Sequence, residues 1–338
     1  MALNRLIIPI FIPHQGCPYR CSFCDQKNIS GVNMKTDKEL VESTIDQYLK
    51  SSDSNARSKV CEVAFYGGSF TGLPLDRQSS LLSYVQPLIK EGKVQNIRVS
   101  THPLFINEEN LRNLRSFGVT TVELGIQSTD QNVLMRSGRE CSWSAMDDAV
   151  KMIRGFGFNL GLQMMSGLPE DTEKTFAQTV KDVLNWNPDF VRIYPTLVIK
   201  GTEIHEMYLN KTFVPWSLEK TISVLKEAVL KFRNRKIPII RLGLPSEPSM
   251  LENFVAGPYH PSIRYLIDCS IGLDELSAMV KELPVSQKSI SFQVPMKKLS
   301  IYKGHKLENV NKIKESFNLN EVTVNPLEGL KYPQMIAA

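Results

Sequence analysis

The 338-residue chain lacks any long hydrophobic run. No apolar stretch approaches the ~20 residues that are needed to span a bilayer. The first apolar stretch, from Leu6 to Pro13, is short and no small-residue cleavage site follows it. The sequence therefore predicts neither a membrane helix nor a signal peptide, and we expect a cytoplasmic protein with no membrane partner.

The chain also lacks low-complexity segments. Its hydrophobic share of 42% and charged share of 22% are ordinary, which excludes a disordered, a collagen-like or a coiled-coil protein. Several sequence motifs are missing too. Gly155-x-Gly157 has no third glycine of a dinucleotide loop, and no Gly-x4-Gly-Lys-Ser/Thr occurs. No Gly-x-Ser-x-Gly elbow of a hydrolase and no His-x-Glu with Pro-Cys-x-x-Cys of a zinc deaminase is present.

Cysteine is scarce, but its placement is informative. Three of the six cysteines, Cys17, Cys21 and Cys24, lie within eight residues. Random scattering of six cysteines would give only about 0.002 such matches, so the spacing indicates a metal clip. Zinc needs four ligands, and His14 offers a fourth. An iron–sulfur cluster on three cysteines would instead leave one iron open, as catalytic metal sites do. Both interpretations stay open at this point.

The other three cysteines, Cys61, Cys141 and Cys269, stand alone in apolar or helical surroundings. We expect them to be buried thiols that take no part in metal binding.

Strand-like and helix-like segments alternate along most of the chain. The expected strands cover residues 5–13, 62–67, 97–102, 120–127, 158–167 and 189–199, with a seventh candidate at 237–244. The expected helices cover residues 37–52, 78–92, 107–118, 143–157, 171–186 and 217–236. Six consecutive βα units predict an α/β fold with a parallel sheet, curled into a partial (β/α)6 barrel. A doubly wound open sheet is the competing arrangement.

The rest of the chain differs in pattern and is expected to form a small C-terminal α+β appendage. We predict a core domain over residues 1–245 and a second region, of unknown role, over 246–338. In the second region the patterns indicate helices near 273–281 and 309–317 and strands near 290–294, 299–302 and 321–324.

In such barrels the chemistry lies at the carboxyl ends of the strands. Here those ends carry the unusual residues of the sequence. They include the cysteine loop, Gly67-Gly68, Ser100, Gln127, Gln163 and Tyr194. Because six such loops would converge on one face, the sequence favours an enzyme over a binding module. Tyr194 is expected either to stack on a base or to close the barrel. The residues that carry out catalysis are not identifiable from the sequence.

The cysteine loop after the first strand, with Phe23 before the last cysteine, resembles the cluster motif of the radical S-adenosylmethionine (SAM) superfamily. That resemblance implies a [4Fe–4S] cluster on Cys17, Cys21 and Cys24 whose fourth iron binds SAM. An electron from the cluster would cleave SAM to methionine and a 5′-deoxyadenosyl radical, which abstracts hydrogen from a substrate. It also implies a reductant such as flavodoxin or ferredoxin.

Single positions extend the resemblance. Gly67-Gly68 matches the glycine pair that presents its backbone to SAM. Gln127 and Arg139 match the spacing of two SAM-binding residues in the oxygen-independent coproporphyrinogen oxidases. Gln163 and Ser100 stand where that subgroup has an Asp and a Glu, which are departures from its pattern.

Longer segments resemble the radical SAM half of the Elongator catalytic subunit, over about residues 5–245. They are Phe65–Phe70, Val122–Ser128, Met164–Pro169 and Arg192–Glu203. This resemblance implies modification of tRNA. That subunit also uses acetyl-CoA in a C-terminal domain for which this chain is expected to have no room. Its cluster cysteines are more widely spaced, and its Thr-Arg-Pro-Asp pattern appears here as Thr101-His102-Pro103-Leu104.

Charge placement bears on the substrate. Net charge is only +5, but residues 217–241 hold seven basic side chains against two acidic ones. Residues 297–314 hold six lysines against Glu308. Such segments attract polyanions, although a solvated helix face has the same pattern. Three hypotheses follow: a radical SAM enzyme acting on tRNA, one acting on a small porphyrinogen-like or CoA-linked molecule, and a zinc-clipped binding module.

Overall fold

The computed structural model describes residues 5–17, 19–25, 36–51, 60–244, 246–282 and 288–337. The chain forms two compact units. Unit 1 comprises Met1–Trp216 and Phe232–Pro258, and unit 2 comprises Ser217–Lys231 and Tyr259–Ala338. These units do not coincide with the domain boundary expected at residue 245, which stays a prediction.

Unit 1 is built on a seven-stranded sheet whose strands pair in parallel in the order β1-β2-β3-β4-β5-β6-β8. The strands are β1 (Arg5–Phe11), β2 (Val60–Tyr66), β3 (Asn96–Thr101), β4 (Val119–Gln127), β5 (Asn159–Ser166), β6 (Phe190–Pro195) and β8 (Ile239–Leu242). Their order in space follows their order in the chain. A doubly wound sheet would reverse direction at a switch point, so the partial-barrel prediction is confirmed.

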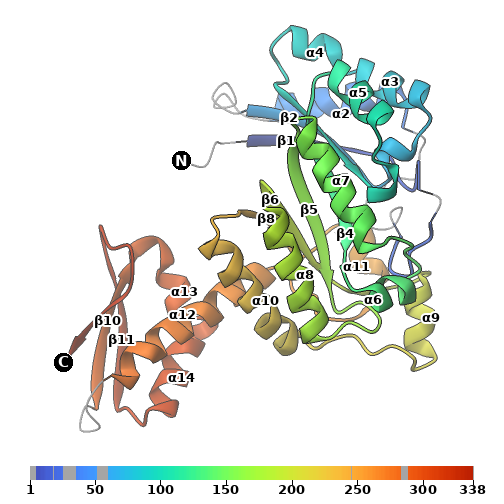
Figure 1. The fold of residues 1–338 in the computed structure, drawn as a ribbon. Helices are drawn as coiled ribbons and strands as arrows, with labels where there is room; N and C mark the ends of the chain where they lie inside the picture. Colours follow the sequence, from blue (N-terminus) through green and yellow to red (C-terminus); the bar gives the residue numbers. More distant parts are fainter. Residues whose placement is uncertain are drawn as a thin grey trace. The chain divides into compact units, whose positions relative to one another are not determined.

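The helices of unit 1 follow the strands, and Figure 1 shows α7 and α8 running beside β5. The helices are α2 (Lys38–Ser51), α3 (Leu75–Ser83), α4 (Gln86–Lys90), α5 (Glu108–Ser116), α6 (Gln131–Arg136), α7 (Trp143–Gly155), α8 (Glu173–Trp186), α9 (Glu203–Leu209) and α11 (Pro248–Asn253). Helix α10 (Leu218–Asn234) contributes residues to both units. Among the described residues, no helix is long and apolar enough to cross a membrane.

Two expected elements of unit 1 are divided in the structure. The helix expected over 78–92 is two helices, and Pro87 in the first turn of α4 has no backbone N–H for a continuous helix. The strand expected over 189–199 ends at Pro195, which likewise cannot donate to a ladder. After it, β7 (Val198–Ile199) pairs antiparallel with β9 (Phe254–Ala256) in a separate small sheet.

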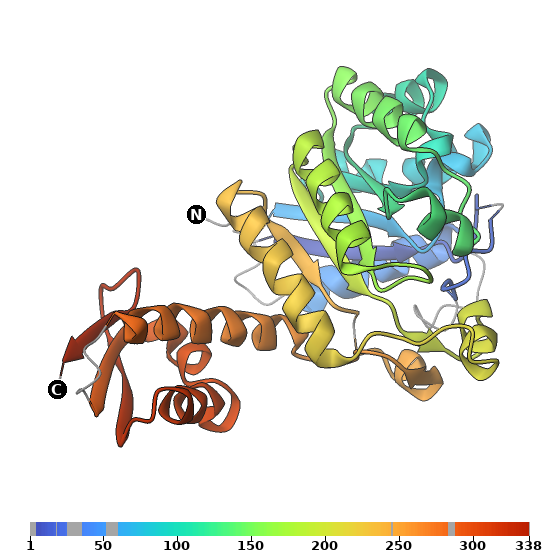
Figure 2. The same ribbon diagram turned by 60° about the horizontal axis from the view of Figure 1, so that its bottom comes forward.

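Unit 2 is a three-stranded sheet with helices on one face (Figure 2). Strand β10 (Ser289–Pro295) lies between β11 (Glu321–Leu327), which is parallel to it, and β12 (Gln334–Ala337), which is antiparallel. The helices are α12 (Ile263–Lys281), α13 (Leu299–Lys303) and α14 (Glu308–Ser316).

The strand expected over 299–302 was wrong, because this segment is α13. Leu299 and Tyr302, three residues apart, both pack on the apolar core of unit 2. A four-residue apolar run fits the period of a strand and of a helix turn equally, so tertiary packing decides between them. Helix α12 also begins ten residues before the expected start at 273.

Candidate functional site

A cavity of about 720 Å³ opens where the strands of unit 1 end. Its wall includes residues from β1 to β6, from β8 and from the cysteine loop. The structure brings all ten predicted site residues to this wall: Cys17, Cys21, Cys24, Gly67, Gly68, Ser100, Gln127, Arg139, Gln163 and Tyr194. Residues spread over 178 positions of sequence thus share one cavity, because parallel strands of one sheet end at the same edge.

The three clustered thiols are not joined in a disulfide and reach the cavity from one short loop. Backbone hydrogen bonds hold that loop: Cys24 N donates to Cys21 O at 2.9 Å, and Ser22 N donates to Ser137 O at 2.9 Å. Among the described residues, no three His, Cys, Asp or Glu side chains are grouped to chelate one ion. Three thiols on one loop fit three irons of a cluster, whereas structural zinc needs four ligands on a single ion.

Glycines seat the cysteine loop against the loop that follows β2. A Cβ on Gly16 would lie 2.2 Å from Ser69 O, and one on Gly72 would lie 2.0 Å from Gly16 O. A Cβ on Gly68 would lie 2.4 Å from Gln15 O. Only glycine permits such close approach of two backbones. Gly68 therefore also has a packing role beside any contact with a ligand.

The end of β4 holds a second set of predicted residues. Gln127 has a left-handed backbone with φ of 65°, and Gln163 Nε2 donates to Gln127 Oε1 at 3.2 Å. Arg139 donates through Nη2 to Gly125 O and through Nη1 to Cys21 Sγ at 3.6 Å. Arg139 thereby links the strand end to the cysteine loop. Burial raises the pKa of the Cys17 thiol, and the nearby Arg139 charge opposes that rise.

Several buried polar atoms on the cavity wall have no hydrogen-bond partner among the described residues. They are Ser100 Oγ, His102 Nε2 and Arg139 Nε. Buried polar groups in native proteins are normally satisfied, so these atoms indicate a polar ligand. Together with three thiols and a glycine-lined approach, the wall fits a thiolate-held cluster with a polar cofactor beside it.

His102 is held by the protein rather than poised for proton transfer. Its Nδ1 accepts from Leu104 N at 3.2 Å, and its ring lies 5.2 Å from that of Tyr19. Burial, and secondarily the Arg139 charge, lowers the pKa of His102 to about 3. The ring is therefore neutral and carries its hydrogen on Nε2.

Two methionines at the end of β5 differ in position. Met164 is fully buried in the core, whereas Met165 lines the cavity next to Leu168 and Tyr194. One methionine is thus packing and the other is available to a ligand.

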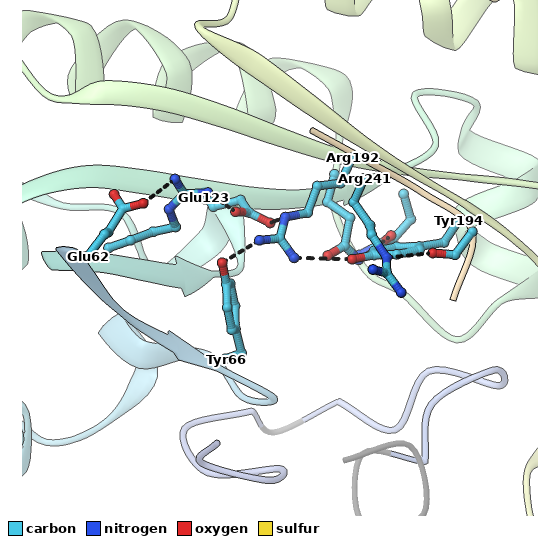
Figure 3. A network of polar contacts seen from close by, with 10 residues as sticks. Glu62, Tyr66, Glu123, Arg192, Tyr194 and Arg241 are labelled. Carbon is cyan, nitrogen blue, oxygen red and sulfur yellow. Dashed lines mark hydrogen bonds and ion pairs between the residues drawn. The ribbon is translucent and has the colours of Figure 1, made fainter. Parts of the chain in front are cut away.

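A chain of buried charges behind the cavity was not foreseen from the sequence (Figure 3). Arg98 Nη2 lies 2.6 Å from Glu62 Oε2, and Arg98 Nη1 lies 3.3 Å from Glu123 Oε2. Arg192 Nε lies 3.0 Å from Glu123 Oε1. Two carboxylates and two guanidinium groups alternate, so the chain is neutral as a whole, which is how buried charge is tolerated. The available signal was a charged residue at the centre of an apolar strand, at Glu62 and again at Arg98.

The chain of charges ends at two tyrosines. Arg192 donates through Nη1 to the Tyr194 hydroxyl at 3.2 Å and through Nη2 to the Tyr66 hydroxyl. Burial first, and the Glu123 charge second, raise the pKa of Tyr66, so its hydroxyl stays protonated. Tyr66, Glu123, Arg192 and Tyr194 all line the cavity. The charges therefore fix the floor of the site.

The comparisons with known proteins agree with this geometry. The family described as the Radical SAM superfamily matches residues 11–183, and the Radical_SAM C-terminal domain matches residues 188–271. The first match spans half of the chain. This chain belongs to the radical SAM superfamily and is a radical SAM enzyme, and its family's cofactors are a [4Fe–4S] cluster and SAM.

Individual proteins that are similar to this chain show which part of the superfamily it resembles. A tRNA uridine(34) acetyltransferase of Methanocaldococcus infernus is 28% identical over 158 residues, which cover 45% of this chain and 30% of that protein. Elongator complex protein 3 of Mus musculus is 26% identical over 136 residues, or 39% of this chain and 25% of that protein. The chain thus matches less than a third of these relatives' length. The solved archaeal Elp3 of Methanocaldococcus infernus shares the fold, with a TM-score of 0.60, 20% identity, and coverage of 79% of this chain and 62% of that one.

Proposed function

We propose that this radical SAM enzyme modifies tRNA. The convergence of all ten predicted residues on one cavity supports the radical chemistry. The choice of tRNA rests on sequence relatives that are named tRNA uridine(34) acetyltransferase. The reaction itself stays open, because the aligned part covers 30% of that relative.

We assign Cys17, Cys21 and Cys24 as the three protein ligands of the cluster. When bound, the reduced cluster supplies the electron that cleaves SAM and so yields the 5′-deoxyadenosyl radical. Metal ligation requires thiolates. Arg139 donates to Cys21 Sγ, and its charge works against the raised pKa of Cys17, so it favours the ligating form of Cys17.

The remaining predicted residues are assigned to SAM. The backbone of Gly67 and Gly68 would face the amino group of SAM from the end of β2. Ser100 Oγ and Arg139 Nε are buried and have no hydrogen-bond partner within the part of the chain that the structure describes, so they are available to polar groups of the cofactor. Gln127 and Gln163 hold each other's amide groups in place, which orients both side chains toward the cavity. Tyr194 forms a wall beside Met165.

The buried charges position the substrate side of the cavity. Arg192 fixes the hydroxyls of Tyr66 and Tyr194, and Arg192 is itself fixed by Glu123. A floor that cannot shift keeps a substrate atom at a constant distance from the reacting centre, which is how enzymes lower the entropic part of a barrier.

A one-electron reductant is a partner of this reaction, and we propose a flavodoxin or a ferredoxin. We also expect the cytosol as its compartment, since reducing conditions there keep cysteine thiols such as these in the reduced form.

The first test is SAM cleavage by anaerobically reconstituted, reduced protein with and without bulk tRNA. We expect tRNA to increase the yield of 5′-deoxyadenosine several-fold, and nuclease-digested tRNA to have no such effect. Equal yields under both conditions would contradict the tRNA substrate. They would favour the small-molecule hypothesis, which the Gln127–Arg139 pair of the coproporphyrinogen oxidase pattern supports.

A further inference from the structure

Unit 2 carries a dense run of positive charge. Residues 288–314 contain seven lysines and one acidic residue, Glu308. Lys312 pairs with Glu308 at 2.5 Å. Within the described residues, no carboxylate lies at ion-pair distance from five others, which are Lys297, Lys298, Lys303, Lys306 and Lys314. All of these but Lys303 are exposed. The charge is therefore directed to solvent rather than used inside the unit.

Much of this charge lies on what we call the basic loop, residues 296–307. It consists of a short 3-10 helix (Met296–Lys298), α13 and the turn that leads into α14. These pieces contact one another in sequence. Met296 and Leu307 stand out of it with exposed fractions of 51% and 48%. An exposed apolar side chain therefore stands at each end of this basic segment.

The end of the basic loop has an unusual backbone conformation that neighbouring residues hold in place. Gly304, Lys306 and Leu307 have φ of 72°, 48° and 65°, a left-handed region that costs lysine and leucine energy. A Cβ on Gly304 would lie 2.7 Å from Asn309 N, so the turn packs tightly against α14. Asn309 is buried, and its Nδ2 donates to Cys269 O at 2.9 Å and to Ile301 O at 3.1 Å. The side chains are thus presented from a fixed platform.

We propose that the basic loop binds the phosphate backbone of a single-stranded segment of the RNA substrate. This inference rests on the proposed tRNA function and adds a binding surface outside the catalytic unit. Lysines without carboxylate partners are available to phosphates, and a fixed loop loses little conformational freedom on binding. Exposed Met296 and Leu307 offer apolar contact to base faces that only an unpaired strand presents.

A known mode of RNA recognition also uses a fixed loop to hold a phosphate backbone. KH modules clamp the backbone of four nucleotides with a Gly-x-x-Gly loop. Here the corresponding turn is Gly304-His305-Lys306-Leu307, and its fourth position keeps a left-handed backbone although it is leucine. Strands β10 and β11, on either side of α13 and α14 in the sequence, pair in parallel. The basic loop and the elements beside it therefore suit RNA among polyanions.

The test compares two triple variants of the full chain. One replaces Lys297→Ala, Lys298→Ala and Lys306→Ala in the basic loop. The matched control replaces three exposed lysines of unit 1, Lys90→Ala, Lys174→Ala and Lys181→Ala, so that net charge is equal. Affinity for bulk tRNA, for a single-stranded RNA oligonucleotide and for its duplex is measured across a salt series, after melting curves have shown that all proteins are folded.

We expect the basic-loop variant to bind tRNA and the single strand at least several-fold more weakly than the control variant. Its salt dependence should also be shallower, because each lost phosphate contact on a single strand removes about 0.7 from the logarithmic slope. The duplex should be affected least.

Three results would overturn the proposal. If the wild-type protein binds tRNA and both triple variants bind it alike, the basic loop is not the surface, although the tRNA function stands. If no protein binds RNA while SAM cleavage proceeds without it, the proposed function fails as well. If the basic-loop variant loses binding to phosphatidylserine vesicles but keeps binding to RNA, the loop recognises a membrane surface instead.

Discussion

The two units use charge in opposite ways. Unit 1 buries Glu62, Arg98 and Glu123 inside its sheet, each with at most 2% of its side chain exposed. Unit 2 has an apolar core around Phe292, Val294 and Ile313 and leaves most of the lysines of residues 288–314 in solvent. Buried ion pairs contribute little net stability, so unit 1 does not carry them for strength. The difference shows that unit 1 is organised to fix polar groups around a cavity, whereas unit 2 is organised to present charge.

The largest effect is expected from replacing the three clustered cysteines of unit 1. Replacing Cys17, Cys21 or Cys24 by Ala should abolish cluster binding and all SAM cleavage, as measured by iron and sulfide content and by 5′-deoxyadenosine. Replacing Cys61, Cys141 or Cys269 should leave the cluster intact, because these thiols are buried away from the cavity. Burial, chiefly, raises the pKa of Cys61 to about 11, which disfavours a metal-binding thiolate. Full activity of any variant of the first three would contradict the cluster assignment.

The glycine contacts give the next largest effect. Gly72→Ala should lose most of its iron, since the new Cβ would lie 2.0 Å from Gly16 O and push the cysteine loop from its seat. Gly155→Ala is the matched control, because a Cβ there has nothing within 4 Å. Equal iron content in the two variants after anaerobic reconstitution would show that the loop is not seated in this way.

Breaking the buried ion pairs of unit 1 should cost more stability than trimming the apolar core of unit 2. Arg98→Met leaves Glu62 and Glu123 buried with a lost partner, which should cost about 3–5 kcal/mol of unfolding free energy. A comparable trimming of the core of unit 2, Ile290→Val, should cost only about 0.5–1.5 kcal/mol. Denaturant unfolding of both variants checks this contrast, and similar midpoints would mean that the charges are not coupled as the distances indicate.

A change of pH is expected to have a smaller effect on folding stability. His102 has a pKa of about 3 in the folded protein, below its ordinary value near 6.5. Below that ordinary value the unfolded state binds a proton that the folded state does not, so stability should fall as pH falls. The loss between about pH 6.5 and about pH 4 should be on the order of 1–3 kcal/mol. His102→Gln should show a flatter profile in unfolding experiments, and identical profiles would refute the role assigned to burial.

Much of unit 1 was predictable because its signals are local and repeated. Alternating apolar strands and amphipathic helices indicate a parallel sheet, and a Cys-x3-Cys-x2-Cys loop after the first strand indicates a metal. By contrast, Leu299–Tyr302 was misassigned because four residues cannot distinguish a strand from a helix turn. The ion pair between Glu62 and Arg98 could not be predicted either. The two residues are 36 positions apart in the sequence, and only the register of neighbouring strands brings them together.

The sequence by itself determined the spacing of the three clustered thiols, the succession of strands and helices and the residues at the strand ends, because these depend on residue type and short-range spacing. The tertiary structure decided which polar groups share the cavity, which glycines seat the cysteine loop, and where the charge of unit 2 is exposed. Those properties depend on distances between segments far apart in the chain. The pairing of the strands in unit 1 and the packing of α13 against α14 in unit 2 set such distances.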